Sequence, residues 1–219
     1  MKVGFITIGQ SPRVDVVPEI LPYIPGVDVI ECGALDGLSM DEIKRLAPRE
    51  GDYVLVTRLR DGSEVKLSRD KIVKRLQECI DFLESKGVDV IGLLCTGEFP
   101  ELSSKSAMLI EPSNLLIKLV EAINPKILGV VIPDNAQIDM TKDKWSRCCD
   151  KVIVVSFSPY SGDEKELPNV LEPLKDADLI VLDCIGYPAR IKYIVKRALN
   201  IPVLLPRSVL GKVIAELGE

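Results

Sequence analysis

Two cysteines of this chain lie in nearly the same local sequence. Cys95 ends the apolar run of DVIGLLCTGEFP (residues 89–100), and Cys184 ends that of DLIVLDCIGYP (residues 178–188), with a glycine two residues later in both. Two thiols that face one carbon atom from opposite sides can remove a proton from one face and return a proton to the other without a cofactor. A single cysteine at a strand end more often only fills space, so it is the pairing that suggests racemisation or isomerisation.

Composition narrows the chemistry further. The 219 residues include no histidine, which excludes an imidazole base, and the absence of any Cys-x-x-Cys pair argues against a zinc site. The net charge is −5 and only ten residues are aromatic, five Tyr, four Phe and one Trp. Nucleic-acid binding needs a basic face or stacking platforms, so we expect no such partner. The expected partner is a small metabolite, with no metal and no cofactor.

The sequence also bears on location. No stretch reaches the roughly 18 apolar residues of a membrane helix, and the start, MKVGFITIG, has a strand pattern rather than that of a signal peptide. We expect a cytoplasmic protein that does not bind membranes, with its six cysteines reduced. Cys79, Cys148 and Cys149 are interpreted as structural, and Cys32, which precedes Gly33, as a weaker candidate for the rim of a site.

Short apolar runs alternate with longer amphipathic stretches, which indicates an α/β fold with parallel sheets covered by helices. One segment differs: residues 52–68 contain two alternating runs joined at Asp61–Gly62, the pattern of a β-hairpin. Ser39 with Glu42 forms the pattern of a capping box. The expected strands cover 2–8, 27–33, 89–94, 107–113, 126–133, 151–157, 178–184 and 202–206. The expected helices cover 11–21, 39–47, 69–86, 113–123, 136–147, 164–175, 190–199 and 208–217, with Ser11, Ser68 and Ser113 as caps.

The two halves of the chain are related. KVGFITIGQSPR (2–13) aligns with KILGVVIPDNAQ (126–137), and the two cysteine segments align more closely still. We therefore expect two pseudo-symmetric α/β lobes. The first comprises residues 1–112 plus 206–219, with the hairpin near 52–68 inserted in it, and the second comprises 113–205. A single continuous sheet would contradict this arrangement.

The expected topology places both cysteines where ligands bind. In an open parallel sheet, ligands lie beyond the carboxyl ends of the strands, and both Cys95 and Cys184 follow such an end. A helix N-terminus after the turn would lower the pKa of each thiol. Strand alternation predicts that Asp183 points away from the side of Cys184 and is structural.

TIGQSPRVDV near the start, LLCTGEFP and LDCIGYP together resemble the AroM family, within the aspartate/glutamate (hydantoin) racemase superfamily, over essentially the whole chain. The superfamily also includes maleate isomerases and arylmalonate decarboxylases. The resemblance implies two racemase-like lobes, with Cys95 and Cys184 in the acid/base positions and a small carboxylate as substrate. It implies further substrate-binding positions on the turns after the cysteines and after the first strand of each lobe: Gly9, Gln10, Ser11, Arg13, Thr96, Gly97, Asn135, Gln137, Ile185 and Gly186.

The sequence departs from the amino-acid racemases, in which Asn-Thr typically follows the first cysteine and Thr-His the second. Here Thr96-Gly97 and Ile185-Gly186 follow, so the expectation is a racemase- or isomerase-like enzyme without an assigned substrate. Two alternatives stay open: a two-lobed metabolite-binding or regulatory protein without catalysis, and a decarboxylase or isomerase that uses one cysteine. The hairpin is either a lid or the edge of a homodimer. Ser11 and Arg13 are as readily explained by a helix cap and a solvated charge.

Overall fold

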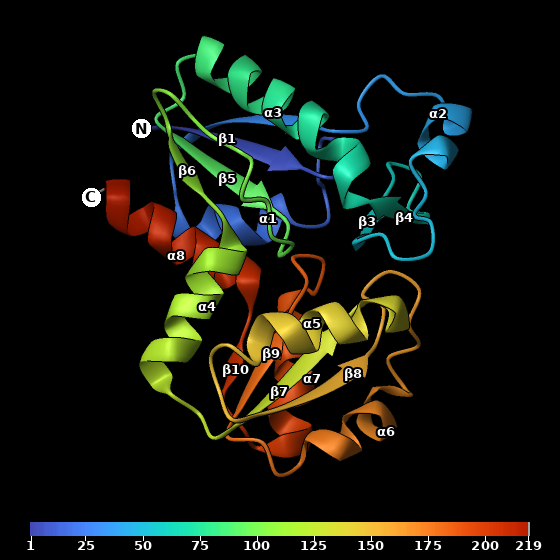
Figure 1. Ribbon diagram of the computed structural model, residues 1–219. Helices are drawn as coiled ribbons and strands as arrows, with labels where there is room; N and C mark the ends of the chain where they lie inside the picture. The colour runs from blue at the N-terminus through green and yellow to red at the C-terminus, as the bar shows by residue number, and fades with distance from the viewer. Residues whose placement is uncertain (219) are drawn as a thin grey trace.

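A computed structural model describes residues 1–218 and shows two separate four-stranded parallel sheets, one in each half of the chain (Figure 1). The expected α/β fold of two lobes is confirmed. The first sheet has the order β2-β1-β5-β6, and the second has the order β10-β9-β7-β8. The strands are β1 (Lys2–Thr7), β2 (Asp28–Gly33), β5 (Val90–Leu94), β6 (Met108–Ile110), β7 (Ile127–Ile132), β8 (Lys151–Ser156), β9 (Leu179–Leu182) and β10 (Val203–Leu204).

The two sheets repeat one topology. In each, the first strand of the half pairs with the second on one side and with the third on the other. The register repeats as well, because Gly4 of β1 lies opposite Ile91 and Gly129 of β7 lies opposite Ile180. Both cysteines come four residues after those isoleucines, so they occupy equivalent positions beyond the carboxyl ends of β5 and β9.

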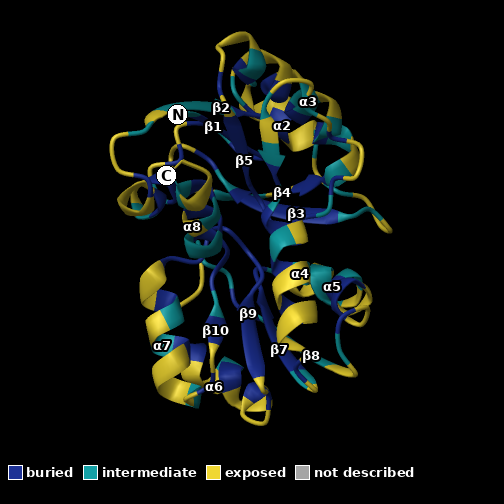
Figure 2. Cartoon of the chain, turned by 90° about the vertical axis from the view of Figure 1, so that its left-hand side faces the viewer, coloured by how far each residue is buried: buried dark blue, intermediate teal, exposed yellow. Residues whose placement is uncertain are grey.

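Helices cover both faces of each sheet and expose their outer sides, while the central strands are buried (Figure 2). The last helix returns to the first sheet, where it packs against α1, α4 and β5. The lobe boundaries at 112/113 and 205/206 stay a prediction.

No helix within residues 1–218 has the length and apolarity needed to cross a membrane. The α-helices are α1 (Val17–Ile20), α2 (Met40–Arg45), α3 (Arg69–Ser85), α4 (Pro112–Ile123), α5 (Ile138–Trp145), α6 (Leu167–Leu171), α7 (Ala189–Leu199) and α8 (Pro206–Gly218).

The predicted hairpin is present as β3 (Val54–Arg58) and β4 (Glu64–Ser68), paired antiparallel. Gly62 in its turn has φ +92°, a conformation that favours glycine. The hairpin belongs to the first half but contacts the second. Lys66 forms an ion pair of 2.5 Å with Asp134, and Gln137 Nε2 donates to the carbonyl oxygen of Val54 at 3.0 Å. The hairpin therefore bridges the lobes.

The predicted helix over 11–21 is wrong. The segment forms only α1 and a 3₁₀ turn over Leu21–Tyr23, each with a proline at its start. Ser11 does not cap a helix, because its hydroxyl donates to Asp36. Ser68 does occupy the N-cap position of the helix that begins at Arg69, although its side chain makes no capping hydrogen bond. The cap assigned to Ser113 is wrong, because the N-cap residue of that helix is Glu111 and Ser113 lies within it. The capping box of Ser39 and Glu42 is confirmed.

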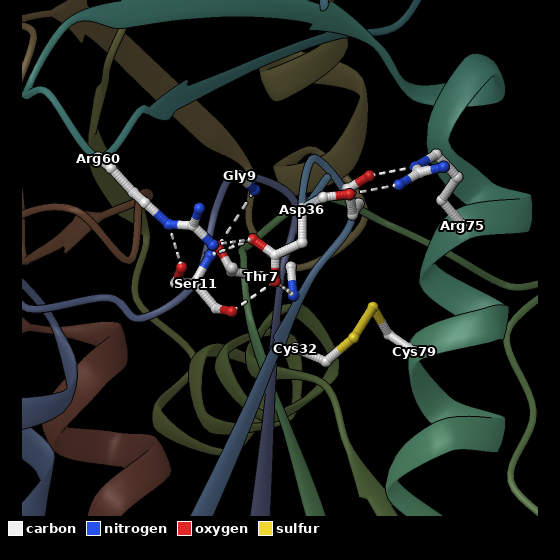
Figure 3. The surroundings of a disulfide bond; sticks show 10 residues. Thr7, Gly9, Ser11, Cys32, Asp36, Arg60, Arg75 and Cys79 are labelled. Atoms are coloured by element: carbon white, nitrogen blue, oxygen red, sulfur yellow. Dashed lines mark hydrogen bonds and ion pairs between the residues drawn. A yellow bond between two sulfur atoms is a disulfide. The ribbon is translucent and has the colours of Figure 1, made fainter. Parts of the chain in front are cut away.

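A disulfide joins Cys32 of β2 to Cys79 of α3 (Figure 3). This corrects the expectation that all six cysteines are reduced, and it removes Cys32 from the candidate site. The bond could not be predicted from the sequence, because 47 residues separate the two cysteines. Packing of α3 against β2 places the Cα atoms of Cys32 and Cys79 5.6 Å apart, which is within the range seen in disulfides. Beside the bond, Asp36 accepts from Ser11, Gly33 and Arg60 and so holds the loop after β1.

We expect reduction of this disulfide to destabilise the protein by about 4 kcal/mol, because a cross-link that closes a loop of 47 residues restricts the unfolded chain. The measurement is guanidinium unfolding with and without reductant. The double variant Cys32→Ala/Cys79→Ala is the control and should have the same stability in both conditions. A wild type that is insensitive to reductant would contradict the stabilising role.

Candidate active site

A cavity lies between the two lobes, and residues of both halves and of the hairpin line it. Its free volume is small, about 40 Å³, on a measure by which one water needs about 10–15 Å³. A cavity of this volume accommodates only a compact ligand. The residues that line it include Arg13, Thr57, Cys95, Thr96, Gln137, Lys144, Tyr160, Asp183, Cys184 and Ile185.

The two thiols sit in matching turns. Both cysteines are buried and line the cavity. The N–H of Gly97 points at Cys95 Sγ at 3.3 Å, and the N–H of Gly186 points at Cys184 Sγ at the same distance. The turns also need their glycines, because a Cβ at position 186 would lie 2.3 Å from the Tyr160 hydroxyl oxygen. The pair detected in the sequence is thus brought to one cavity.

Burial raises the pKa of the Cys95 thiol from 9.0 to about 12 and that of Cys184 to about 11. The glycine N–H groups oppose this rise, as do the positive charges of Lys144 near Cys95 and of Arg13 near Cys184. Desolvation outweighs them. The expectation of lowered pKa values is therefore wrong. Its physical basis is missing, because no helix begins directly after either turn: α4 starts at Pro112 and α7 at Ala189.

A buried ion pair, absent from the sequence prediction, joins the two cysteine turns. Lys144 Nζ lies 3.1 and 3.0 Å from the two carboxylate oxygens of Asp183 and 2.9 Å from the carbonyl oxygen of Thr96. Trp145 Nε1 donates to the same carboxylate at 2.7 Å, and the Thr96 hydroxyl donates to the Asp183 carbonyl oxygen at 3.0 Å. One lysine of α5 thereby ties the residue after Cys95 to the residue before Cys184.

Asp183 was expected to point away from the site, and this is wrong, since it lines the cavity. The residue lies beyond the end of β9, where the N–H of Cys184 bonds back to the Leu182 carbonyl oxygen. Strand alternation no longer applies to such a turn. Lys144 could not be identified because a lysine in an amphipathic helix normally faces solvent; here it is 4% exposed.

Arg13 lines the cavity, but its guanidinium already has partners within the protein. It forms an ion pair with Asp15 at 2.8 Å, donates to the Thr7 hydroxyl at 3.0 Å and donates to the Tyr160 hydroxyl at 3.2 Å. A second buried arginine that the sequence did not reveal, Arg207 of α8, donates to the carbonyl oxygen of Ile185 at 2.8 Å. Both arginines hold the walls of the cavity.

The other predicted binding residues divide into two groups. Thr96, Gly97, Gln137 and Ile185 line the cavity. The structure does not bring the rest to it: Gln10 accepts from the N–H of Arg60, Ser11 is held by Asp36, and Asn135 accepts from Ser156. Gly9 lies against Thr57, and Gly186 lies against Tyr160 on the outer side.

Comparison with known proteins agrees with this arrangement. The family profile described as AroM protein matches residues 3–218. The chain belongs to the AroM family. Solved structures with the same racemase-like fold include an aspartate racemase from Picrophilus torridus, with 17% identity, 99% of this chain and 93% of that chain covered, and a TM-score of 0.63. No curated protein matches the sequence significantly.

Two further structures similar to this AroM family member carry other activities in their names. An allantoin racemase from Klebsiella pneumoniae has 15% identity, with 100% of this chain and 87% of that chain covered and a TM-score of 0.64. A maleate isomerase from Pseudomonas putida has 14% identity, with 99% and 92% covered and a TM-score of 0.64. At such identities the likeness shows the fold alone. Among residues 1–218, no group of three or more candidate ligands is placed to hold a metal ion.

We expect Lys144→Met to destabilise the protein by about 3–5 kcal/mol, because it leaves the Asp183 carboxylate buried without its cation. The measurement is equilibrium unfolding in guanidinium. Adding Asp183→Asn to this variant should restore part of the loss by removing the unpaired charge. Equal stability of the wild type and Lys144→Met would show that the pair is solvated.

The raised thiol pKa values predict a loss of stability in alkali. Below pH 9.0 the thiols are protonated in both the folded and the unfolded state; above it the unfolded chain loses protons that the folded protein retains up to about pH 11. The free energy of unfolding should therefore fall by up to about 1.4 kcal/mol per pH unit for each thiol in this window. Because tyrosines and lysines also titrate there, the test compares the wild type with Cys95→Ser/Cys184→Ser, whose decline should be shallower. Parallel curves would contradict the raised pKa values.

Proposed function

We propose that this AroM family member is a cofactor-independent racemase or isomerase of a small carboxylate, with Cys95 and Cys184 as the acid/base pair. The observation that carries the proposal is the matched pair of buried thiols on one small cavity, each contacted by the N–H of the residue two positions later. Equivalent positions in two lobes are what a reaction at two faces of one carbon needs.

The carboxylate of the substrate is assigned to the backbone of the cysteine turns. Within residues 1–218, the N–H groups of Thr96 and Ile185 donate no hydrogen bond, and both residues line the cavity. Each of these N–H groups belongs to the residue that directly follows a cysteine. Unpaired amide groups in a dry cavity favour an anion. Arg13 is less suited to this role, since Asp15 already neutralises it.

The reaction requires one thiolate and one thiol. The thiolate takes the proton from the α-carbon, the electron pair of the broken C–H bond delocalises into the carboxylate, and the opposite thiol donates its proton to the other face. The thiolate and the thiol have then exchanged states. Since burial holds both thiols protonated, one must first lose its proton to solvent, and Lys144 and Arg13 lower that cost on the Cys95 and Cys184 sides respectively.

The protonated state of both thiols also favours a second candidate, a two-lobed binding protein in which the cavity holds a carboxylate without turnover. Protonated thiols are poor bases and poor nucleophiles, and this observation is what keeps the binding function in view. A single-cysteine isomerase or decarboxylase would need only one of the two turns. Exchange of the α-proton separates these possibilities.

We expect the wild type to exchange the α-proton of its substrate in deuterium oxide and the variants Cys95→Ser and Cys184→Ser each to lose at least about 100-fold of that rate, the usual contribution of a positioned acid or base. Proton NMR of a panel of small 2-substituted carboxylates measures the exchange. Cys149→Ser, at a half-buried cysteine outside the cavity, is the matched control. Full activity of one cavity variant would indicate a single-cysteine enzyme, and binding without any exchange in the wild type would favour the binding protein.

A further inference from the structure

Tyr160 gives one of the two buried thiols a neighbour that the other lacks. It lies in the loop after β8 and lines the cavity together with Cys184. Its hydroxyl oxygen lies against the second cysteine turn, where a Cβ at Gly186 would come within 2.3 Å of it. Burial raises the pKa of Cys184, but a hydrogen bond of the Tyr160 hydroxyl opposes the rise, as do the Gly186 N–H and the charge of Arg13. The hydroxyl therefore stabilises a thiolate at this sulfur.

No hydroxyl group is among the strongest influences on Cys95. After burial, the groups that act most on its pKa are the N–H of Gly97, Cys184, Lys144 and Asp183. The N–H and the lysine favour the thiolate, whereas the aspartate and a charged Cys184 disfavour it. The two cysteines therefore compete, because a thiolate at one sulfur opposes ionisation of the other.

The difference between the thiols follows from the fold. β2 and β8 are equivalent strands, since each is the second strand of its half and pairs in parallel with the first. The loop after β8 brings Tyr160 to the cavity, whereas no residue between β2 and α2 lines it. On the first-lobe side the wall contains Tyr53 instead, whose hydroxyl oxygen accepts from the N–H of Glu98 at 3.3 Å. The site is symmetric in its thiols and asymmetric in its tyrosines.

Contacts with its own loop and with the first lobe hold Tyr160 in place. Its N–H donates to Ser158 Oγ at 3.0 Å, and the Ser158 hydroxyl donates to Glu64 of the hairpin strand β4. Arg13 Nη2 donates to the Tyr160 hydroxyl oxygen at 3.2 Å. Because a guanidinium can only donate, the tyrosine acts there as an acceptor. Its own O–H proton is left to donate to the sulfur of Cys184.

Tyr160 keeps its proton while the thiols ionise. Burial raises its pKa well above the usual 10.0 and beyond that of Cys184. The guanidinium of Arg13, which is 2% exposed, polarises the phenol and strengthens it as a donor. A hydrogen bond from an O–H group to an ionised acceptor is stronger than one between neutral groups. The tyrosine thus favours one thiolate without giving up its proton.

We propose that Tyr160 is a positioning residue that selects Cys184 over Cys95 as the thiol that ionises, through the hydrogen-bonded chain Arg13–Tyr160–Cys184. Cys184 releases its proton to solvent, while Tyr160 and Cys95 keep theirs. The chemical consequence rests on the proposed function. In that reaction the Cys184 thiolate takes the α-proton, and the Cys95 thiol donates its proton to the opposite face.

The test measures ionisation of each thiol and needs no substrate. Iodoacetamide reacts with thiolates rather than thiols, and mass spectrometry of the digested protein gives separate rates for Cys95 and Cys184 at a pH below both pKa values. Loss of a hydrogen bond to an anion makes the thiol about 10- to 100-fold less acidic. A more basic thiolate is also more nucleophilic, which recovers part of the rate. We therefore expect Tyr160→Phe to slow alkylation of Cys184 about 3- to 10-fold and to leave that of Cys95 unchanged.

A second measurement does not depend on access of a reagent. In protein labelled with ¹³C at the cysteine Cβ atoms, the chemical shift of Cys184 follows its ionisation. Its titration midpoint should rise by about one to two pH units in Tyr160→Phe. Tyr53→Phe removes the hydroxyl of the other tyrosine in the cavity wall and is the matched control. It should leave both the rate and the midpoint of Cys184 unchanged.

The outcomes separate this role from a structural one. A loosened cavity would expose both thiols and speed both reactions, so slowing confined to Cys184 supports the proposal. An unchanged midpoint of Cys184 in Tyr160→Phe overturns it, as does an equal effect of Tyr53→Phe on Cys184. Because neither measurement uses a substrate, a failure of α-proton exchange, which would contradict the proposed function, leaves this result intact.

Discussion

The buried contact of Lys144 with Asp183 and the Thr96 carbonyl is the constraint on which the site depends. Desolvating a lysine and an aspartate is costly, and the pair is tolerated because each charge meets several partners at hydrogen-bonding distance. Replacing both charged residues together by hydrophobic residues of similar size could leave the lobes as stable. Such residues could not connect the residue after Cys95 to the residue before Cys184 by hydrogen bonds. The polar junction therefore links the two cysteine turns, which a hydrophobic pair would not do.

The same burial that strengthens this junction opposes ionisation of the two thiols. Exclusion of water raises both thiol pKa values, and only the glycine N–H groups and the nearby cations counteract it. A cavity that opens to solvent eases loss of the proton, and one that closes strengthens the contacts to a developing carbanion. The cavity has a free volume of about 40 Å³, and the hairpin contacts and the lysine junction join the two lobes around it.

Features of the fold that depend on local sequence patterns could be predicted, and features that depend on contacts between distant elements could not. The strands, the two lobes and the cysteine pair were predictable, because apolar periodicity and an internal repeat can be recognised along the chain. Lys144 and Arg207 were not, since their burial depends on elements distant in sequence, and a charged residue in a helix usually faces solvent. The disulfide could not be predicted for the same reason, because Cys79 reaches Cys32 only once α3 packs on β2. The prediction of a helix that begins at Ser11 was wrong, because the Ser11 hydroxyl binds Asp36 instead of capping a helix.

The pseudo-symmetry of the lobes bears on how the substrate of the proposed reaction would be oriented. Cys95 and Cys184 have equivalent turns and equivalent glycine contacts, so these alone would bind a substrate in two opposite directions with similar affinity. A reaction at two faces of one carbon tolerates this for the carbon itself, but not for the remaining substituent. The wall itself is asymmetric, because residues of the hairpin strand β3 line the cavity and the second half has no such insertion. In the reaction proposed above, a hairpin inserted into one copy of a repeated unit would favour one of the two substrate orientations.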